Sequence, residues 1–342
     1  MLISIFLLVA IMFASKGKFT RLSESVLLCN YVKYMAALAV VLTHLMSNYC
    51  KSSFWVMETN LGSKAVSLFF FFSGYGLMYK LSKDSGGYLK DFLKKRLVRI
   101  IIPLLTAYVV YIVSIYMGGN IPNYHRLFFG LLSFDPYLPY SWYVTEIILL
   151  YLSFYAVAKV SKSLKQVVKW LSVIISVLIV GGYMLHFESH LICSTFCFVM
   201  GINYQEYESS IYDWLHKRKI LQFASVFVFA VMFNWVRIYN VLGISFIKEY
   251  SELYPYVANM LFTLVVVHLL QNTTFNLKNR YFISSSYELY LNQAAVFIVI
   301  STLTDNCWLM IVGSFLLCMV ITPIIAKVNT SISKVLLQKM IG

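Results

Sequence analysis

The chain has 342 residues, of which 60% are hydrophobic and only 12% carry a charge. Soluble domains have about 25% charged residues, so this composition excludes a water-soluble enzyme, a coiled coil and a disordered protein. The formal net charge is +14. In a membrane protein such an excess reflects Lys and Arg in cytoplasmic loops, and we therefore expect membrane lipids rather than nucleic acid as partners.

The first predicted element is an apolar stretch over 1–14, which is followed by Lys16, Lys18 and Arg21. A cleaved secretory signal carries its positive charge before the apolar core, so the sequence favours an uncleaved anchor with its N-terminus outside. A full crossing needs about 20 residues. An oblique or interfacial helix is therefore an alternative for this stretch.

Apolar runs suited to crossing a bilayer then recur almost to the end of the chain. We place transmembrane helices near 29–47, 64–80, 100–117, 142–158, 170–186, 190–205, 220–236, 254–271, 286–303 and 307–326. The sequence thus predicts an all-α integral membrane protein, a bundle of about ten transmembrane helices with an extra N-terminal apolar helix. We divide the chain into an anchor with a basic linker, a membrane domain and a short cytoplasmic tail, at 1–25, 26–328 and 329–342.

The distribution of positive charge predicts the orientation of this bundle. If residues 16–28 are cytoplasmic and the helices alternate, the inner loops hold 22 of the 28 Lys and Arg residues and the outer loops hold 5. The opposite orientation would place the larger group outside, against the positive-inside rule. The connections 118–141 and 237–253 are then extracytoplasmic, and their Tyr, Asn and Pro residues are compatible with loops along the membrane interface.

Cysteine and histidine spacing predicts no metal site. The six cysteines lie mostly in apolar runs, and Cys193 with Cys197 has no second pair at metal-site spacing. His186 and His190 fall in a predicted outer turn, and no third ligand follows them. We therefore expect neither a metal nor a redox role for these residues.

Polar residues inside apolar spans are costly and are candidates for function. Lys33 and His44 are eleven residues apart in the first span, which places them on nearly one face and about 16 Å apart along a helix. A histidine can act as a general base near neutral pH. The alternative is a Lys that reaches the interface and a His bonded to a neighbouring helix.

A second candidate is a cluster of cations at the cytoplasmic boundary. Arg99 lies three residues after Arg96 and four residues after Lys95, so we expect the three cations to share a helix face. Such a face can bind phosphates, and Arg does so with two hydrogen bonds. It could equally contact lipid headgroups or only fix the topology.

Three further polar features have an ordinary alternative beside a functional one. Glu146 lies near the outer start of a span, where it is an acid/base group or a partner for a buried cation. Ser73 follows four consecutive Phe residues and, with Gly74 and Gly76, favours the close approach of another helix. The polar helix end at 286–293 is explained by hydrogen bonds between helices.

Taken in order, these stretches resemble the acyltransferase-3 family of integral membrane acyltransferases. The resemblance covers about residues 26–326. It includes a basic residue followed by ten residues and a His, a Phe run ending in Ser-Gly, basic residues before a Pro, a Trp-aromatic pair and a Ser-Tyr-x-x-Tyr-Leu motif. These motifs are Lys33 with His44, Phe69–Phe72 with Ser73 and Gly74, Arg96 and Arg99 with Pro103, Trp142 with Tyr143, and Ser286, Tyr287, Tyr290 and Leu291.

Two positions depart from the family pattern. The late motif often continues to a His, where this chain has Gln293. Some members carry a Glu five residues after the Trp, and this chain has Ile147 there with Glu146 one residue earlier. A shift of one residue rotates a helical side chain by about 100°, so the family role does not transfer directly to Glu146.

The resemblance implies transfer of an acyl group, commonly acetyl from acetyl-CoA, to a hydroxyl of a surface polysaccharide or another glycan, free or lipid-linked. It implies a multi-pass protein of the cell membrane that uses acetyl-CoA as co-substrate and no metal. We assign catalysis to His44, Lys33 and Glu146, binding of CoA to Arg96, Arg99 and Lys95, and contact with substrate to Trp142, Tyr143, Ser73, Tyr287 and Gln293.

Two alternatives to this function stay open at this stage. A transporter or polymerase of polysaccharide would need a polar track through several spans, with helices broken near the membrane midplane. A transferase for succinyl or another acyl group would share the architecture. For an acetyltransferase, the cytosolic donor and an outward His44 require either an acyl arm that reaches into the membrane or an acyl-enzyme intermediate.

Overall fold

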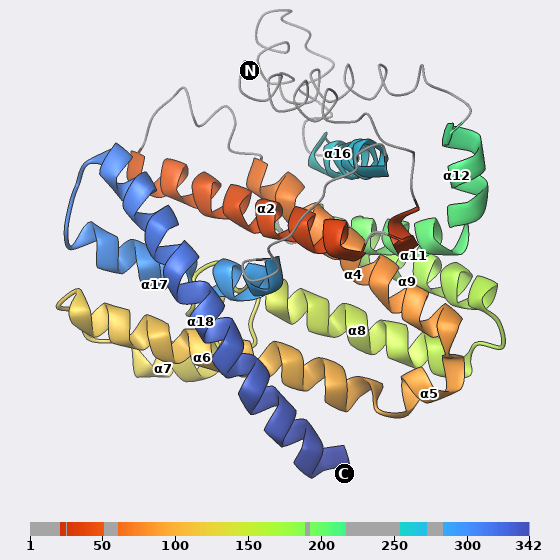
Figure 1. Cartoon of the computed structure of the whole chain (residues 1–342), viewed down its shortest axis with the longest axis horizontal. Coiled ribbons are helices and arrows are strands. Elements are labelled where there is room, and N and C mark those ends of the chain that lie inside the picture. The colour runs from red at the N-terminus through yellow and green to blue at the C-terminus, as the bar shows by residue number, and fades with distance from the viewer. Residues whose placement is uncertain are drawn as a thin grey trace, which may run out of the picture. The chain divides into compact units, whose positions relative to one another are not determined.

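The computed structural model of the chain describes residues 21–24, 26–50, 61–188, 192–216, 254–271 and 283–341 (Figure 1). Within these ranges every regular element is a helix. The expected N-terminal helix at 1–14 and the expected span at 220–236 lie outside the described residues.

Six helices of the described part are long and apolar enough to cross a membrane. The first is α2, which continues into a short π-helical turn, η2, at Met46–Cys50. The six are α2 (Val26–Leu45), α4 (Leu61–Lys83), α6 (Phe92–Met117), α8 (Trp142–Val160), α9 (Leu164–Met184) and α18 (Cys307–Ile341). The described residues thus form helices alone, and six of the ten expected spans fall on helices long enough to cross a membrane.

Three other expected spans are shorter helices. These are α11 (Phe196–Glu206), α16 (Tyr254–Gln271, with its apolar part at Pro255–His268) and α17 (Ser286–Ser301). At 1.5 Å per residue, the 16 residues of α17 extend about 24 Å, less than a hydrocarbon core of about 30 Å. The described residues therefore do not confirm the expected count of ten spans.

The chain divides into two compact units, and the helices α2, α4 and α9 contribute residues to both. Unit 1 comprises Met1–Lys33, Ser53–Tyr79 and Ser172–Lys278. Unit 2 comprises Tyr34–Ser52, Lys80–Leu171 and Asn279–Gly342.

In unit 1, two glycines let helices α4 and α11 pack with their backbones in contact. A Cβ atom at Gly74 would collide with the carbonyl oxygen of Phe198, and one at Gly201 would collide with the carbonyl oxygen of Phe71. Only small residues permit such an approach in a membrane helix pair. The packing role expected at Gly74 is therefore confirmed, whereas a Cβ at Gly76 would meet open space.

A buried polar cluster also joins the helices of unit 1. The amide of Asn259 on α16 donates to Ser63 Oγ at 2.8 Å, Ser194 Oγ at 3.0 Å and Cys193 Sγ at 3.3 Å. One turn along α16, Thr263 bonds with Ser67 at 2.7 Å. Hydrogen bonds of this kind hold helices together where lipid supplies no hydrophobic driving force.

The short helix α12 (Glu208–His216) follows α11 in unit 1 and carries a buried carboxylate. Glu208 accepts hydrogen bonds from the hydroxyl of Tyr75 at 2.9 Å and from the backbone N–H of Ser23 at 3.3 Å. Ser23 belongs to the 3₁₀ turn η1 (Leu22–Glu24). These bonds attach the segment before α2 to α4 and α12.

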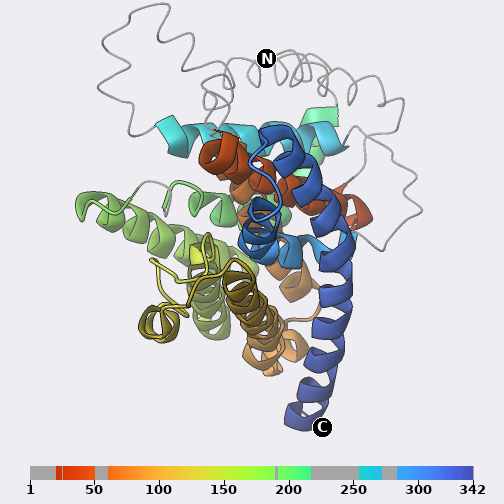
Figure 2. The ribbon, with the colours of Figure 1, turned by 90° about the vertical axis from the view of Figure 1, so that its left-hand side faces the viewer.

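In unit 2, helices α6, α17 and α18 pack against one another, and α8 packs on α6 (Figure 1). The short elements α5 (Ser85–Lys90), α7 (Tyr124–Phe129) and η3 (Ile283–Ser285) belong to the same unit. With 35 residues, α18 is about 52 Å long and exceeds the hydrocarbon thickness. Figure 2 shows α18 as one long helix, so residues 329–341 of the expected tail continue this helix.

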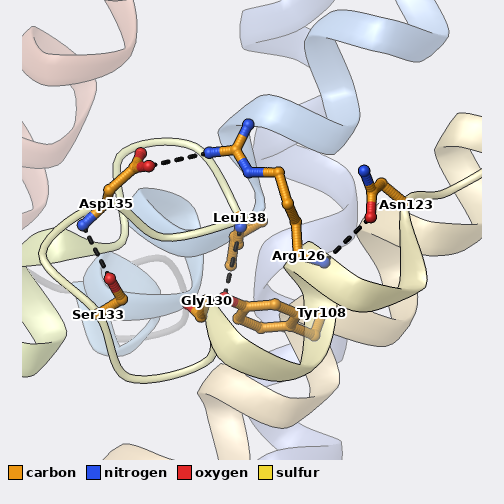
Figure 3. Close-up of polar contacts among 7 residues, drawn as sticks. All are labelled: Tyr108, Asn123, Arg126, Gly130, Ser133, Asp135 and Leu138. Carbon is orange, nitrogen blue, oxygen red and sulfur yellow. Dashed lines mark hydrogen bonds and ion pairs between the residues drawn. The ribbon is translucent and has the colours of Figure 1, made fainter.

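The connection between α6 and α8 folds back beside α6. The hydroxyl of Tyr108 donates to the carbonyl of Gly130 at 2.8 Å and accepts the N–H of Leu138 at 3.4 Å (Figure 3). Tyr108 lies nine residues before Met117, the last residue of α6, so this contact is about 13 Å inside the end of the helix. The segment thus folds back along α6, past the end of this helix and toward its middle. The position at the membrane interface that the sequence analysis expected for 118–141 stays a prediction.

Polar contacts within the connection fix this folded-back path (Figure 3). Asn123 caps α7 by accepting the N–H of Arg126 at 3.0 Å, and Arg126 forms an ion pair with Asp135 at 3.0 Å. Ser133 accepts the N–H of Asp135 at 3.0 Å. Non-helical backbone is tolerated at membrane depth only where protein buries it or where it lines a cavity, and Leu138 is fully buried.

A disulfide bond joins Cys50, the last residue of η2, to Cys307, the first residue of α18, with Cα atoms 5.1 Å apart. The sequence analysis expected no redox role for cysteines, and this bond corrects that expectation. The partners are separated by 257 residues, and spacing alone cannot reveal such a pairing. Both helix ends are extracytoplasmic in the orientation inferred from charge, where oxidising conditions preserve disulfides.

Candidate active site

His44 is the penultimate residue of α2 and lies in unit 2. Its imidazole stacks on the ring of Tyr140, with ring centroids 3.7 Å apart and an angle of 18° between the planes. Tyr140 belongs to the segment that folds back along α6. The tertiary structure therefore brings the end of the first span against the start of α8.

Tyr140 is held from three sides. Its ring contacts His44, its hydroxyl accepts a hydrogen bond from the amide of Asn48, and its carbonyl oxygen accepts one from the hydroxyl of Tyr290. Its backbone has a φ of 70°, a conformation that is uncommon for residues other than glycine. Burial raises the pKa of Tyr140 to about 12, so its hydroxyl is neutral at physiological pH.

The first turns of α8 complete this cluster. The ring of Tyr143 packs edge-on against Tyr290, with centroids 5.5 Å apart. Glu146 is buried and lies within electrostatic reach of Tyr290. We call His44, Tyr140, Tyr143, Glu146 and Tyr290 the histidine cluster. Glu146 thus lies on the face of α8 that meets α17.

A cleft of about 1100 Å³ lies on another side of α17, between α6 and the second half of α18. The side chains of Arg99 and Lys334 line it together with the carboxyl group of Glu288. Glu288 is buried and accepts a hydrogen bond from Asn329 at 3.3 Å, and Asn329 in turn accepts one from Thr106 at 2.8 Å. The cleft therefore combines cations with buried polar groups.

Pro103, which also lines the cleft, lies inside α6 and removes one of its backbone hydrogen bonds. Proline has no N–H to bond with the carbonyl four residues earlier, which here belongs to Arg99. The next carbonyl, of Ile100, accepts a hydrogen bond from the hydroxyl of Tyr287 at 3.3 Å. Pro103 thus removes a helical hydrogen bond from α6 at the place where Tyr287 of α17 bonds to the α6 backbone.

The expected cationic face divides into three environments. Lys95 forms an exposed ion pair with Asp91 at 3.3 Å. Arg96 donates to the hydroxyl of Tyr88 at 2.8 Å, and its guanidinium lies over the rings of Tyr88, Phe92 and Tyr151. Burial raises the pKa of Tyr88, and the positive charge and hydrogen bond of Arg96 partly offset this rise. Of the three cations, only Arg99 lines the cleft.

Helix α17 connects the cleft to the histidine cluster. Tyr287 lines the cleft, and Tyr290 bonds to the backbone of Tyr140. Three residues along a helix correspond to about 4.5 Å, and Tyr287 is in electrostatic contact with both Tyr143 and Tyr290. Gln293 is buried on the same helix and donates to the carbonyl of Tyr290 at 2.8 Å.

Unit 2 thus contains most of the residues that the sequence analysis assigned to the site. Trp142 is the first residue of α8, beside Tyr143. Lys33 and Ser73 belong to unit 1, and their assigned roles stay predictions. No group of three potential metal ligands occurs within the described ranges.

Sequence reasoning missed Tyr140, Asn48 and Lys334. Tyr140 lies two residues before the recognised pair of Trp142 and Tyr143. Its positive φ and its contacts depend on the tertiary structure, so the sequence did not single it out. Asn48 lies one helical turn after His44, and this spacing could have identified it from the sequence. Lys334 was counted only among the inner cations that set the orientation, because the last helix was expected to end near residue 326 and not at Ile341.

The sequence also matches the family model described as an acyltransferase domain, Acyl_transf_3, over residues 29–327. The match covers most of the chain and includes the histidine cluster and the cleft residues of α6 and α17, whereas the cleft residues of α18, from Asn329 onward, lie beyond it. The chain belongs to the acyltransferase-3 family. Comparison with curated proteins and comparison with solved structures gave no match.

Family membership fixes the general chemistry of this membrane acyltransferase. Its reaction requires an acyl donor and an acceptor that bears a hydroxyl group. Attack by a hydroxyl needs a base, and a donor that carries phosphates needs cations. Unit 2 of this acyltransferase contains a histidine cluster and a cation-lined cleft on the same helix, α17.

Proposed function

We propose that this acyltransferase moves an acetyl group from acetyl-CoA to a hydroxyl of a surface polysaccharide or another glycan, and that it acts in the cell membrane. The observation that carries the proposal is the connection, through α17, of a histidine cluster to a cation-lined cleft. The histidine cluster supplies a base, and the cation-lined cleft supplies a site for an anionic donor.

The donor binds in the cleft. Arg99 on α6 and Lys334 on α18 offer positive charge from two walls, and such side chains bind the phosphates of CoA. The orientation inferred from charge opens this side of α6 and α18 to the cytoplasm, where acetyl-CoA is made. Arg96 donates to Tyr88 and Lys95 pairs with Asp91, so these two cations contribute to the local potential and Arg99 makes the direct contact.

The acceptor reacts at His44. The imidazole takes the proton of the acceptor hydroxyl, and the hydroxyl oxygen bonds to the thioester carbonyl carbon. The carbon–sulfur bond then breaks, and the proton passes from His44 to the sulfur of CoA. Glu146 and Lys33 stabilise charge during transfer, and Trp142, Tyr143, Ser73, Tyr287 and Gln293 contact the substrates.

Direct transfer requires the thioester to pass from the cleft toward Tyr140. The cleft reaches Tyr287, and Tyr290 is one helical turn further along α17. We therefore favour an acyl arm that extends along α17 over a covalent acyl-enzyme. Acetyl is favoured over succinyl, because the acyl group reacts at the histidine cluster, where the buried carboxyl group of Glu146 disfavours a second carboxylate.

The test uses the purified full-length protein in lipid nanodiscs with labelled acetyl-CoA and surface glycan from cells that lack the gene. We expect acetyl ester signals in the NMR spectrum of the glycan, and no transfer with succinyl-CoA. The variant His44→Ala should lose about 10²–10⁴-fold in rate. The matched control is His125→Ala, because His125 is an exposed histidine of α7. Normal acetylation by His44→Ala, or no consumption of acetyl-CoA by the native protein, would contradict the proposal.

A further inference from the structure

We infer that Tyr140 is a positioning residue for the acyl transfer: its ring fixes the plane of the His44 imidazole, so that the histidine meets the acceptor hydroxyl in one orientation. This inference rests on the proposed function of His44. Nothing in the sequence motifs assigns a role to Tyr140, which precedes the recognised Trp-aromatic pair.

The stacking geometry carries the inference. A centroid distance of 3.7 Å and an angle of 18° place the two rings face to face, so rotation of the imidazole about its bond to Cβ is blocked on that side. A general base must lie within about 2.6–3.2 Å of the proton that it removes. A ring held in one plane directs its nitrogen atoms along the edge, away from Tyr140.

The backbone of Tyr140 points to the same conclusion. Among the described residues, Tyr140 and His186 alone have a positive φ without being glycine. Residues in such conformations persist only where the surroundings determine them, and they concentrate at functional sites. A glycine would adopt this φ without strain, so the side chain of Tyr140 must contribute something that glycine cannot.

The three contacts of Tyr140 hold its ring relative to His44. Asn48 donates to its hydroxyl from η2, one turn after His44 on the same helical segment. Tyr290 donates to its carbonyl from α17. The ring is therefore tied at its far end to the segment that carries His44 and at its backbone to the helix that lines the cleft.

The elements that hold Tyr140 are themselves anchored. Tyr49 on η2 packs against Phe297 of α17 with ring centroids 5.7 Å apart, and the disulfide of Cys50 joins η2 to α18. On the other side, the hydroxyl of Ser141 donates to the carbonyl of Leu138 at 2.9 Å. Tyr140 thus acts through His44 and need not contact the substrate.

Three substitutions of Tyr140 test this role in the full-length protein. Tyr140→Phe keeps the ring and loses the bond from Asn48, so kcat should stay within about threefold. Tyr140→Leu and Tyr140→Gly remove the ring and should lower kcat by about 10²-fold, the effect of a displacement of about 1 Å in an active site. The KM for acetyl-CoA should not change, because the cleft is intact. Tyr140→Gly relaxes the φ but loses the packing of the ring, so its Tm should fall and its kcat is measured on the folded protein.

The control variant is Tyr137→Leu in the same folded-back segment, where Tyr137 packs against Tyr111 at 5.8 Å. It should affect Tm and leave kcat near the native value. If Tyr137→Leu lowered kcat as much as Tyr140→Leu, the effect would belong to the segment and the inference would be overturned. Full kcat in folded Tyr140→Gly would overturn it as well.

A spectroscopic measurement separates this inference from the proposed function. In protein labelled only at histidine, the His44 ring signals should be shifted upfield by the Tyr140 ring and identified by their absence in His44→Ala. They should keep this shift in Tyr140→Phe and lose it in Tyr140→Leu. If His44→Ala keeps full activity, the proposed function fails. If His44→Ala is inactive and Tyr140→Leu keeps both the shift and kcat, only the role of Tyr140 fails.

Discussion

Two buried polar clusters, one in each unit, show how differently membrane-embedded polar residues can be used. In unit 1, Asn259 donates to Ser63, Ser194 and Cys193, so neutral groups on packed helices satisfy one another. In unit 2, the polar residues surround His44 and a backbone in an unusual conformation at Tyr140. The same principle of costly burial thus produces helix packing in one region and a candidate active site in the other.

The comparison teaches that a polar residue in a span is informative only together with its surroundings. Ser63 and Asn259 are satisfied by nearby hydroxyl and thiol groups. Tyr140 and Tyr290 bring His44 to a helix that also borders a cleft. Substitutions in unit 1 should therefore change stability alone, and substitutions in unit 2 should change kinetics.

The largest effect is expected from removing the disulfide by Cys50→Ser together with Cys307→Ser. A disulfide that closes a long loop contributes about 2–4 kcal/mol to stability, so Tm should fall by several degrees. Turnover should also fall, because η2 carries Asn48, which holds Tyr140. Thermal unfolding and acetylation rates of the purified variant measure both effects, with Cys318→Ser, a free buried cysteine, as the control. Unchanged stability would show that the bond does not hold unit 2 together.

The next effect concerns the donor cleft. Arg99→Gln and Lys334→Gln should each raise the KM for acetyl-CoA by about tenfold, because a hydrogen bond to a charged group contributes about 1.5–3 kcal/mol. The value of kcat should stay near the native one. Lys339→Gln is the matched control, since Lys339 is an exposed cation of α18 outside the cleft. Equal KM values for Lys334→Gln and Lys339→Gln would remove α18 from the donor site.

A packing change in unit 1 should show the opposite pattern. Gly201→Ala places a Cβ against the carbonyl oxygen of Phe71, and such overpacking costs about 1–3 kcal/mol. We expect a lower Tm and unchanged kcat and KM for the protein that remains folded. Gly76→Ala is the control in α4, because its Cβ would meet open space. A selective fall in kcat with normal Tm would contradict the division between the two units.

The smallest effect is expected for the polar cluster of unit 1. Asn259→Ala removes the amide whose two hydrogens serve Ser63, Ser194 and Cys193, and interhelical bonds in membranes contribute about 0.6 kcal/mol each on average. Stability should fall slightly and turnover should not change. Asn48→Ala in unit 2 should instead lower turnover by about twofold to threefold, as Tyr140→Phe does by removing the same hydrogen bond, and leave Tm near the native value. If the two variants behaved alike in both assays, the contrast between the clusters would not hold.

Several features could be predicted from the sequence because they depend on local pattern. Long apolar runs gave the spans at α2, α4, α6, α8, α9 and α18, and the Phe run with Ser73 and Gly74 predicted close helix packing. The order of short motifs indicated the family. The choice of His44 as a candidate base required only a titratable side chain at helical spacing from a cation.

Other features depend on contacts between distant parts of the chain. The lengths of α17 and α11 were overestimated because apolar composition continues past the helix ends into neighbouring segments. Spacing suggested one cationic face for Lys95, Arg96 and Arg99, but Asp91, the aromatic rings and the cleft each take one of them. The Asp91–Lys95 pair has helical spacing, but the contact of Arg96 with Tyr151 on α8 and the position of Arg99 beside α17 and α18 are not visible in a single sequence.

The sequence by itself determined that the chain is an all-α membrane protein of the acyltransferase-3 family, because hydropathy, charge and motif order are properties of local stretches. Only the tertiary structure decided that Cys50 bonds Cys307, that the segment before α8 folds back along α6, and that Tyr140 stacks on His44. Each of these features joins residues that are far apart along the chain. Their positions are fixed by packing and by the need to satisfy buried backbone groups, which no local pattern encodes.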